Sequence, residues 1–584
     1  MSGPRFGPLL RRDGAALRLW APAARAVTAM LDRPHPMMKD DAGWFTVEVA
    51  QARAGTRYKF RIDDEIEVPD PASHFQPDDV SGPSEIIDHT AYPWRAPQWT
   101  GRPWSEAVIL ECHVGTFTPA GTYRAMIEKL EHLVDSGITA IELMPLADFA
   151  GARNWGYDGV LWYAPDHVYG TPDDLKTLID EAHLRGLMVF LDVVYNHFGP
   201  EGNYLGRYAP QFFCDRQTPW GAAIDYQRPE VEDFAIENAL HWLGHYRFDG
   251  LRLDAVHAIG EPGGLKLLAE LSQAVGEFAQ QTGRIIHLML ENDDNRTSLL
   301  DPTTAAPRGK YRAQWNDDYH HAWHVLLAGE THGYYMDYER PAELIARVLR
   351  KGFAYQGEAS KHRGGTKRGE AVNNLPPTAF INFLQNHDQI GNRALGDRLE
   401  WSADPRAMEA ALAVTLLAPM PPMLFMGEEF GARTPFPFFC DFRGELADAI
   451  RAGRRREFAQ AYAAFGDEVP DPLALATFKS AVLNWSDLAD AGLHRHAYVK
   501  RLLQVRRAEI VPRLATIKFQ DADHRNGVLL ASWLSAGDSL LLLQANLSDE
   551  PRPRRQADQG LQIWGRGVPD RIQPWSVFWS TREA

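Results

Sequence analysis

The sequence predicts an α/β protein whose central domain is a (β/α)8 barrel of the TIM type, preceded by a β-sandwich and followed by a second β-domain. Three observations support this prediction. Between about residues 108 and 430, eight short apolar runs alternate with amphipathic segments, as repeated strand–helix units require. The two ends of the chain instead carry short strands of alternating apolar and polar residues. We therefore expect domains at residues 1–93, 94–474 and 475–584.

The N-terminal segment is expected to form a small β-sandwich. Runs such as LRLWAP, WFTVEV and RYKFRID alternate apolar and polar residues, and clusters of turn-forming residues separate them. This pattern is typical of short antiparallel strands. A stretch rich in proline and tryptophan, residues 92–104, then separates the segment from a region with a different periodicity.

The eight apolar runs are the expected barrel strands. Helical patterns fill the gaps, for instance TPDDLKTLIDEAHLRG, which has Pro172 early, acidic residues in its first turn and Gly186 as a stop signal. In chain order the runs are VILECHVGTF, AIELMPL, MVFLDVVYNH, GLRLDAV, IIHLMLEND, YRAQWNDD, FINFLQNHD and MLFMGEEF. Eight such repeats indicate a (β/α)8 barrel.

Two long segments interrupt the repeat. Residues 198–228, after the third run, are rich in glycine, proline and aromatic residues, and another long excursion follows the sixth run. Such long connections are commonly functional. The second excursion includes a basic, glycine-rich stretch, residues 358–374, which we expect to be a mobile solvated loop, with a binding site as the alternative. After about residue 475, the runs RNGVLLASWL and SLLLLQANLS predict the C-terminal β-domain.

Composition argues against several classes of function. The net charge of −16, from 61 Lys and Arg against 77 Asp and Glu, opposes binding to nucleic acid. No apolar stretch approaches the roughly 20 residues that cross a bilayer, and the first residues lack the apolar core of a secretory signal. The wide spacing of Cys112, Cys214 and Cys440 fits neither a zinc knuckle nor a disulfide framework. We expect a cytoplasmic protein that binds neither nucleic acid nor membrane.

The fourth run, GLRLDAV, carries two charges on one face. Leu251 and Leu253 share one side of the expected strand, so Arg252 and Asp254 share the other. Burying a charged pair costs several kcal/mol unless the charges are paired or used. This stretch alone leaves a structural ion pair and a functional site equally open.

Polar residues end most of the eight runs. In a barrel, the C-terminal ends of the strands converge on one face, where active sites are built. Asp254, Glu291 and Asp388 would then meet in one pocket, and their mutual repulsion would raise the pKa of at least one carboxyl group. Glycosidic bond cleavage needs one protonated and one ionised carboxyl group. The polar residues at the strand ends are Asp192, His197, Asp254, His257, Glu291, Asp293, His387 and Asp388.

Four stretches also resemble a known family. DVVYNH, GLRLDAVH, the glutamate of LMLEND, and FLQNHD are similar in order and spacing to the four signature regions of the α-amylase superfamily of glycoside hydrolases. The N-terminal segment resembles the β-sandwich of the branching, debranching and trehalose-forming members. Within the superfamily, NWGYDGVLWYAP, VVYNHFGPEGNYL and AQWNDDYHHAWHVLLAGE most resemble the trehalose-forming members, with glycogen branching enzyme as the nearest rival.

The resemblance implies a role for each of the three carboxylates. Asp254 would be the nucleophile that forms a covalent glycosyl-enzyme intermediate, and Glu291 the general acid and then base. Asp388 would bind hydroxyls of the distorted sugar and stabilise the transition state. The resemblance also implies sugar-binding or supporting roles for His197, His387, Arg252, Tyr157 and Asp192, with Tyr157 as an aromatic platform under the sugar.

Several further residues are candidates for contacts with sugar. Trp155, Trp220 and Trp315 could stack on sugar rings, or they could cap the core. His257 could contact sugar on the leaving-group side, or satisfy a buried polar network. Asn196 matches a position that binds calcium in many α-amylases, but the trehalose-forming members generally lack that site, so neither a metal nor a cofactor is expected.

The activity that the resemblance implies is retaining hydrolysis of the α-1,4 bond next to the terminal trehalose of maltooligosyl trehalose. Loops around residues 198–228 and 315–340 would recognise the trehalose unit, and a separate enzyme would form the trehalosyl end without necessarily binding this chain. The first alternative is a branching transferase, in which a sugar hydroxyl attacks the same intermediate. The second is a non-catalytic glycan-binding scaffold.

Overall fold

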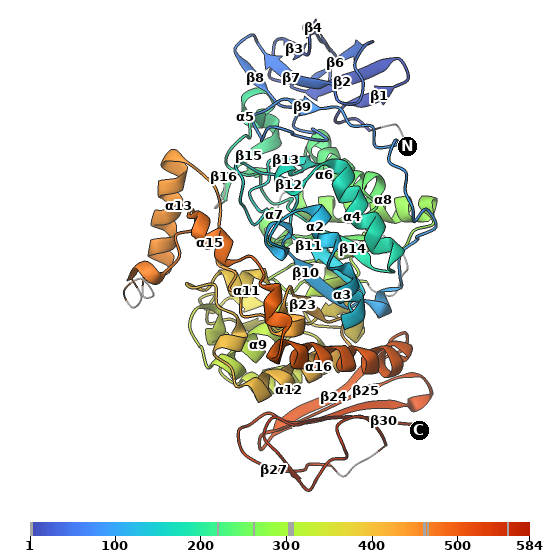
Figure 1. The fold of residues 1–584 in the computed structure, drawn as a ribbon, viewed down its shortest axis with the longest axis vertical. Helices are drawn as coiled ribbons and strands as arrows, with labels where there is room; N and C mark the ends of the chain where they lie inside the picture. Colours follow the sequence, from blue (N-terminus) through green and yellow to red (C-terminus); the bar gives the residue numbers. More distant parts are fainter. Residues whose placement is uncertain are drawn as a thin grey trace.

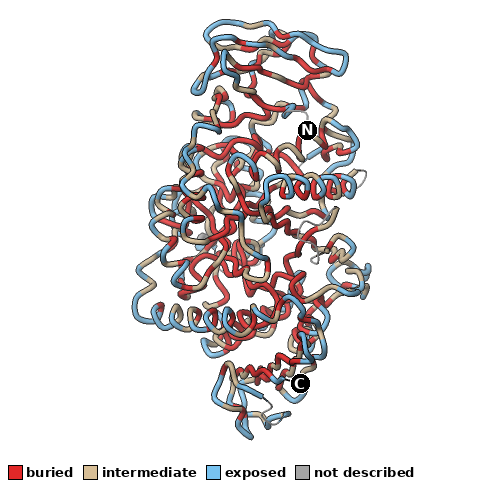
Figure 2. The backbone as a smooth tube through the Cα atoms, turned by 90° about the vertical axis from the view of Figure 1, so that its right-hand side faces the viewer, coloured by how far each residue is buried: buried red, intermediate tan, exposed pale blue. Residues whose placement is uncertain are grey.

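A computed structural model describes residues 4–218, 221–260, 263–301, 309–459, 463, 466–556 and 560–583. Two small sheets near the N-terminus, a central barrel and a C-terminal sheet follow one another along the long axis of the molecule (Figure 1). Buried backbone is concentrated in the barrel (Figure 2). Within the described ranges, no helix is both long enough and apolar enough to cross a membrane.

The central sheet is an eight-stranded barrel, as the sequence predicts. Its strands are all parallel, and each lies within one of the eight expected runs. A further parallel bridge between Asn382 and Pro422 joins the first and last strands of the sheet and closes the barrel. In sheet order, the strands are β22 (Phe380–Ile381), β19 (Ala313–Trp315), β18 (His287–Leu290), β17 (Gly250–Leu253), β14 (Met188–Val193), β11 (Ala140–Leu143), β10 (Ile109–Cys112) and β23 (Met423–Phe425).

Helices connect the strands and cover the barrel. In α4, Thr171 and Asp174 form a capping box and Pro172 is the first helical residue, so the sequence signals for this helix act as expected. The principal helices are α2 (Tyr123–Ile127), α3 (Leu130–Ser136), α4 (Pro172–Leu184), α6 (Pro229–His245), α8 (Gly264–Thr282), α9 (Asp317–Ala328), α10 (Pro341–Lys351), α12 (Pro405–Leu417) and α16 (Ala491–Val505).

Shorter elements lie in the connections between the principal ones. The segment after β14 contains α5 (Leu205–Tyr208) and the hairpin of β15 (Phe213–Thr218) and β16 (Gly221–Ile224). The others are α1 (Val114–Phe117), β12 (Ala147–Asp148), β13 (Leu161–Pro165), α7 (Val256–Ile259), β20 (Glu358–Ala359), β21 (Lys367–Arg368), α11 (His387–Gly391) and α15 (Leu475–Ser480). A longer helix, α13 (Gly444–Glu457), lies between β23 and α15.

The inside of the barrel is apolar at the N-terminal ends of the strands, called here its lower end, and polar at their C-terminal ends, its upper end. Apolar side chains fill the lower part, among them Ile109, Ala140, Met188, Phe190, Met289, Ala313, Ile381, Phe383 and Met423. Because strand side chains alternate, the next inward positions along the chain are Glu111 after Ile109, Glu142 after Ala140, and Asp192 after Phe190. The polar layer therefore lies at the C-terminal ends of the strands, where the sequence places the site.

The N-terminal region contains two antiparallel sheets. Ala15, Leu17 and Leu19 from one sheet, and Tyr58 and Phe60 from the other, are buried in the core. The first sheet holds β1 (Leu9–Arg11), β2 (Gly14–Trp20), β6 (Trp44–Val49) and β5 (Met38–Lys39). The second holds β4 (Pro34–Pro36), β3 (Val27–Met30), β7 (Arg57–Ile62) and β8 (Ile66–Val68), with β9 (Ser84–Glu85) paired to β7.

The C-terminal sheet packs against the barrel through α10 and α12, at the opposite end of the molecule from the N-terminal sheets (Figure 1). Trp533 and Trp579 stack at 5.5 Å between ring centroids, and the Trp579 indole donates a 3.2 Å hydrogen bond to the Ala413 carbonyl of α12. The sheet itself begins at Lys518. Its strands are β24 (Lys518–Arg525), β25 (Val528–Leu534), β26 (Leu540–Asn546), β30 (Val577–Arg582) and β28 (Leu561–Trp564), beside the pair β27 (Arg552–Pro553) and β29 (Arg571–Ile572).

Candidate active site

Arg252 is the centre of the polar layer at the upper end of the barrel. Its guanidinium is fully buried and contacts three carboxylates: Asp192 at 2.6 Å, Asp254 at 2.8 Å and Glu291 at 2.8 Å. Strand register produces this arrangement, because Arg252 lies opposite Asp192 on β14 and opposite Met289 on β18. Asp254 and Glu291 each follow two residues later, on the same inward face.

The backbone of β17 and of the residues that follow it allows this close approach to β18 and Glu291. A side chain at Gly250 would meet the His287 carbonyl oxygen at 2.3 Å, so only glycine allows β17 and β18 to approach so closely here. Ala255 has φ of 40°, in the left-handed region, and its amide donates a 2.8 Å hydrogen bond to Glu291. Backbone strain of this kind is common where function fixes the geometry.

Asp254 and Glu291 lie side by side at the mouth of the barrel. The Asn196 side chain donates a 2.7 Å hydrogen bond to one Asp254 oxygen, while Arg252 contacts the other. Their side chains remain 13% and 16% exposed, so both can be reached from solvent, whereas Arg252 cannot. Burial raises the pKa of Glu291 well above its usual value; Arg252 opposes this, and the charges of Asp254 and Asp388 add to it.

Asp388 comes from a different part of the chain, the first turn of α11. Its side chain is 37% exposed and lies 3.4 Å from the His387 imidazole. Burial would raise the pKa of Asp388, but the neighbouring His387 charge outweighs burial and lowers it. Burial in turn disfavours protonated His387, yet Asp388 and Glu111 raise the pKa of His387 well above its usual value. The pair is thus an ionised carboxylate beside an imidazolium.

Tyr157 lines the same site. Its hydroxyl donates a 2.6 Å hydrogen bond to Asp192, and its ring stacks on His387 with 5.0 Å between centroids. His197 reaches the Tyr157 carbonyl at 2.8 Å. Burial raises the pKa of Asp192 to about 6 despite the contact with Arg252. The structure therefore brings ten of the twelve expected site residues into one network of hydrogen bonds, ion pairs and ring contacts. They are Asp192, His197, Arg252, Asp254, Glu291, Tyr157, His387, Asp388 and, through ring contacts with His387 and Arg252, Trp155 and Trp315.

Comparisons with known proteins agree with this geometry. Residues 92–211 match the family of the alpha amylase catalytic domain, and residues 5–73 match carbohydrate-binding module 48, the isoamylase N-terminal domain. The malto-oligosyltrehalose trehalohydrolase of Deinococcus radiodurans is 41% identical to this chain, and the match covers 93% of this chain and 89% of the relative. The chain belongs to the malto-oligosyltrehalose trehalohydrolases.

Two further relatives have higher and lower sequence identity to this chain. A Salmonella typhimurium protein of known crystal structure, described as an alpha amylase, has a TM-score of 0.93 and 42% identity, and the match covers 99% of this chain and all of the other. The 1,4-alpha-glucan branching enzyme of Rhodococcus jostii is 28% identical, over 72% of this chain and 59% of its own length.

Trp155 and Trp315, which the sequence offers as sugar-stacking residues, are more deeply buried than the site carboxylates. Trp315 is 1% exposed in β19, inside the barrel, and the Arg252 guanidinium lies 4.0 Å from the centre of its ring. Of the two roles left open for Trp315, stacking on sugar or packing in the core, this position matches the second, because Trp315 shares the inward face with Ala313. Trp155 is 4% exposed and stacks on Phe436 at 5.3 Å, so its ring is also in the core. Trp220 lies outside the described residues.

His257 is placed at the rim. It is exposed on α7, and its ring accepts a 3.3 Å hydrogen bond from the Asp293 amide. The buried polar network that the sequence left open for His257 is therefore not what surrounds it. His257 lies beside Asp293 at the rim of the site and makes no hydrogen bond to Asp254, Glu291 or Asp388 among the described residues.

Sequence reasoning missed three contributors to the site. Glu111, on β10, accepts hydrogen bonds from the His387 ring at 2.5 Å and from its amide at 3.0 Å. Burial, with the charges of Asp293 and Asp388, raises the pKa of Asp317 to about 7 at the edge of the same site. An acid inside an apolar run was the available signal for Glu111, whereas Asp317 in WNDD offered none that separates it from an ordinary helix start.

The third contributor is the basic stretch 358–374. Arg363 contacts Asp293 and also Asp294 at 2.9 Å, while Arg368 contacts Asp318 at 2.8 Å. Most of the stretch is exposed, as expected of a solvated loop, but it is not free, because Arg363 and Arg368 pair with acids that follow β18 and begin α9.

The Glu111–His387 contact yields a prediction. Glu111→Gln removes the buried negative charge that helps to keep His387 protonated, so the basic limb of the kcat/KM profile should move to lower pH and kcat should fall about tenfold. Glu142→Gln is the matched control, since Glu142 is buried on the neighbouring strand and burial already raises its pKa well above its usual value. An unshifted pH profile in Glu111→Gln would show that Glu111 only fills space.

Proposed function

We propose that this chain is a retaining glycoside hydrolase that cleaves the α-1,4-glucosidic bond next to the terminal trehalose of maltooligosyl trehalose and releases trehalose. The observation that carries the proposal is the 41% identity to a trehalohydrolase over 93% of the chain. Asp254 and Glu291 beside Arg252, and Asp388 beside His387, supply chemistry that fits this reaction.

Asp254 is the proposed nucleophile. Arg252 and Asn196 each hold one of its carboxylate oxygens, at 2.8 and 2.7 Å, which fixes the direction in which the group faces. Attack on the anomeric carbon breaks the glycosidic bond and forms a glycosyl ester on Asp254. Water then attacks the same carbon and releases the sugar with its α-configuration retained.

Glu291 is the proposed acid and base. Burial and the charge of Asp254 raise the pKa of Glu291, which favours the protonated form that can give its proton to the leaving oxygen. Once Asp254 is esterified, that negative charge is lost and the pKa of Glu291 falls. Glu291 can then accept the proton of the attacking water, so a single residue serves both half-reactions.

Asp388 and Tyr157 are the proposed binding groups for the sugar being cleaved. Asp388 stays ionised beside His387, and can accept hydrogen bonds from two sugar hydroxyls or stabilise positive charge at the anomeric carbon. Tyr157 is held by Asp192 and His387, which fixes the ring at the mouth of the barrel. Groups held in place in this way need no rearrangement in the transition state.

The alternatives are less well supported. A branching enzyme would use the same intermediate, but the branching relative is only 28% identical, over 72% of this chain. A non-catalytic glycan-binding scaffold would not need three carboxylates and a buried arginine at one barrel mouth, given what that arrangement costs to bury. The three free cysteines fit the proposed cytoplasmic location. A separate enzyme that forms the trehalosyl end of the glucan would supply the substrate.

The products distinguish hydrolysis from branching. Incubation with maltotriosyl trehalose should give free trehalose, and NMR should show the new reducing end of the maltotriose first as the α-anomer, because two inversions restore the configuration. Incubation with amylose should give no α-1,6 linkages. New α-1,6 linkages would instead support the branching enzyme, and an initial β-anomer would contradict a covalent intermediate.

A further inference from the structure

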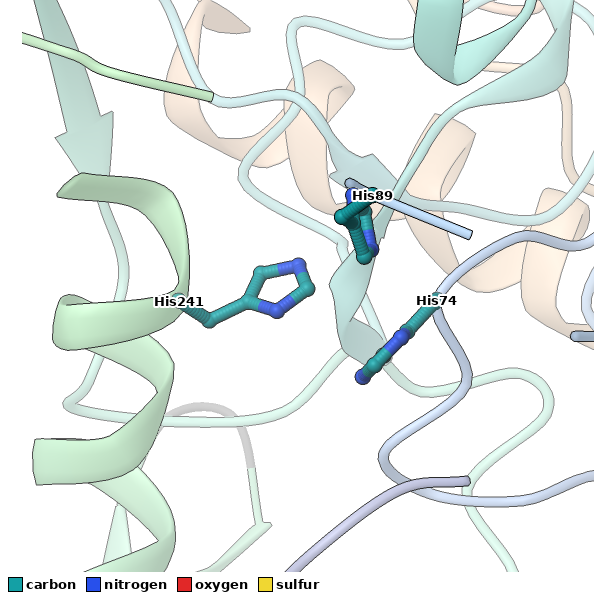
Figure 3. A group of neighbouring side chains, drawn as sticks. All are labelled: His74, His89 and His241. Atoms are coloured by element: carbon teal, nitrogen blue, oxygen red, sulfur yellow. The ribbon is translucent and has the colours of Figure 1, made fainter. Parts of the chain in front are cut away.

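Three histidines meet at the junction between the N-terminal region and the barrel, away from the active site. His74 precedes β9, His89 follows it, and His241 belongs to α6. Figure 3 shows the three rings converging, one from the helix and two from N-terminal segments. The centroid of the His74 ring lies 4.7 Å from that of His241 and 5.0 Å from that of His89. One nitrogen from each ring can be chosen so that all lie within 4.8 Å of one another.

The nitrogens of these rings are buried without partners. His74, His89 and His241 are 8%, 9% and 6% exposed. Among the described residues, nothing hydrogen-bonds Nδ1 of His74, either nitrogen of His89, or Nε2 of His241. Buried polar atoms are nearly always paired, so several unpaired nitrogens at one point indicate a ligand that accepts their lone pairs.

The rings are also in the form that a metal needs. Burial lowers the pKa of His74 to about 3 and the pKa values of His89 and His241 well below their usual value, so all three are neutral. The His241 ring hydrogen-bonds the backbone of Tyr163, which leaves its Nε2 as the nitrogen with a lone pair. A backbone contact of this kind commonly orients metal-binding histidines.

We propose that His74, His89 and His241 together bind one divalent first-row transition ion, Zn²⁺ being the expected metal. Three imidazole nitrogens without a carboxylate favour such an ion over Mg²⁺ or Ca²⁺, which prefer oxygen ligands. Water can complete a four-coordinate site. The bound ion joins the segments on either side of β9 to helix α6 of the barrel.

One cation lies near the site and limits its affinity. The Lys176 ammonium lies over the rings of Tyr92 and Tyr246, at 5.6 and 5.9 Å, and is held by Asp173 at 3.1 Å. Its charge contributes to the lowered pKa values of the three histidines, which keeps them unprotonated. The same charge repels a dication, so we expect micromolar binding and not the tighter binding of thiolate sites.

Zinc titration of the full chain tests the proposal. Protein without a histidine tag, stripped with a chelator, should take up about one Zn²⁺ per chain in competition with a chromogenic chelator, and its Tm should rise by several degrees. His241→Gln and His89→Gln should each weaken binding about a hundredfold or more and abolish the rise in Tm. His494→Gln, which removes an exposed histidine on α16, should change neither.

The outcomes are decisive in both directions. Wild-type protein that binds Zn²⁺ no more tightly than His241→Gln overturns the proposal, as does equal weakening by His494→Gln. If a glutamine variant fails to fold, Co²⁺ in wild-type protein decides the question. Strong visible d–d absorption of four-coordinate Co²⁺ that Zn²⁺ displaces supports the site, and weak six-coordinate absorption or none contradicts it.

Discussion

Replacing Asp254 with asparagine should lower kcat on maltotriosyl trehalose by about ten-thousandfold, while the chain folds and binds substrate normally. An amide has nearly the shape of a carboxylate but cannot form the glycosyl ester. Arg252 would keep two of its three carboxylate partners, Asp192 and Glu291, so the buried guanidinium stays paired. Steady-state kinetics, circular dichroism and calorimetric titration with substrate measure activity, folding and binding separately.

The control for this change is a carboxylate of the same kind far from the barrel mouth. Asp135 lies on the surface of α3, where it pairs with Lys500 at 2.5 Å, and Asp135→Asn should leave kcat and KM unchanged. Residual activity of Asp254→Asn above about a tenth of wild type would rule out Asp254 as the nucleophile. A general loss in both variants would show a problem of folding.

The barrel could be predicted because its strands are buried on both faces. Each strand therefore appears as a short apolar run, and the polar residues that end the runs mark the face where the strands finish. Register then explains the pairing of Arg252 with Asp192, which lie opposite each other on β17 and β14. These features follow from local periodicity, so one sequence is enough to predict them.

Contacts between distant segments could not be predicted in this way. Glu111 and His387 are 276 positions apart and meet because β10 lies beside the strands that end the barrel. The pairing of Arg363 with Asp293 likewise depends on how a long loop folds back, which its basic composition does not reveal. Trp315 is different, since alternation from Ala313 would have placed it inside the barrel.

Replacing Glu291 with glutamine should separate the two half-reactions. On maltotriosyl trehalose, kcat/KM should fall about a thousandfold, because the trehalose oxygen leaves without a proton. An activated aryl malto-oligoside has a leaving group that needs no proton, so its first half-reaction should remain fast. The second should be slow, because Glu291 no longer accepts the proton of water. We expect the time course to show a burst of released phenol, equimolar with the enzyme, followed by slow turnover.

Two further measurements, detection of the trapped intermediate and the pH profile, test whether Glu291 acts as acid and base. Intact-protein mass spectrometry should show one glycosyl unit attached, and azide should speed turnover, because an anionic nucleophile needs no base. In wild type, kcat/KM should fall as pH rises through the raised pKa of Glu291, since the acid is then ionised. In Glu291→Gln this fall should disappear and leave only the one that follows loss of the proton from His387. Glu142→Gln should keep wild-type behaviour in every measurement. If Glu291→Gln loses activity equally on activated and natural substrates, Glu291 positions the sugar and a different group supplies the proton.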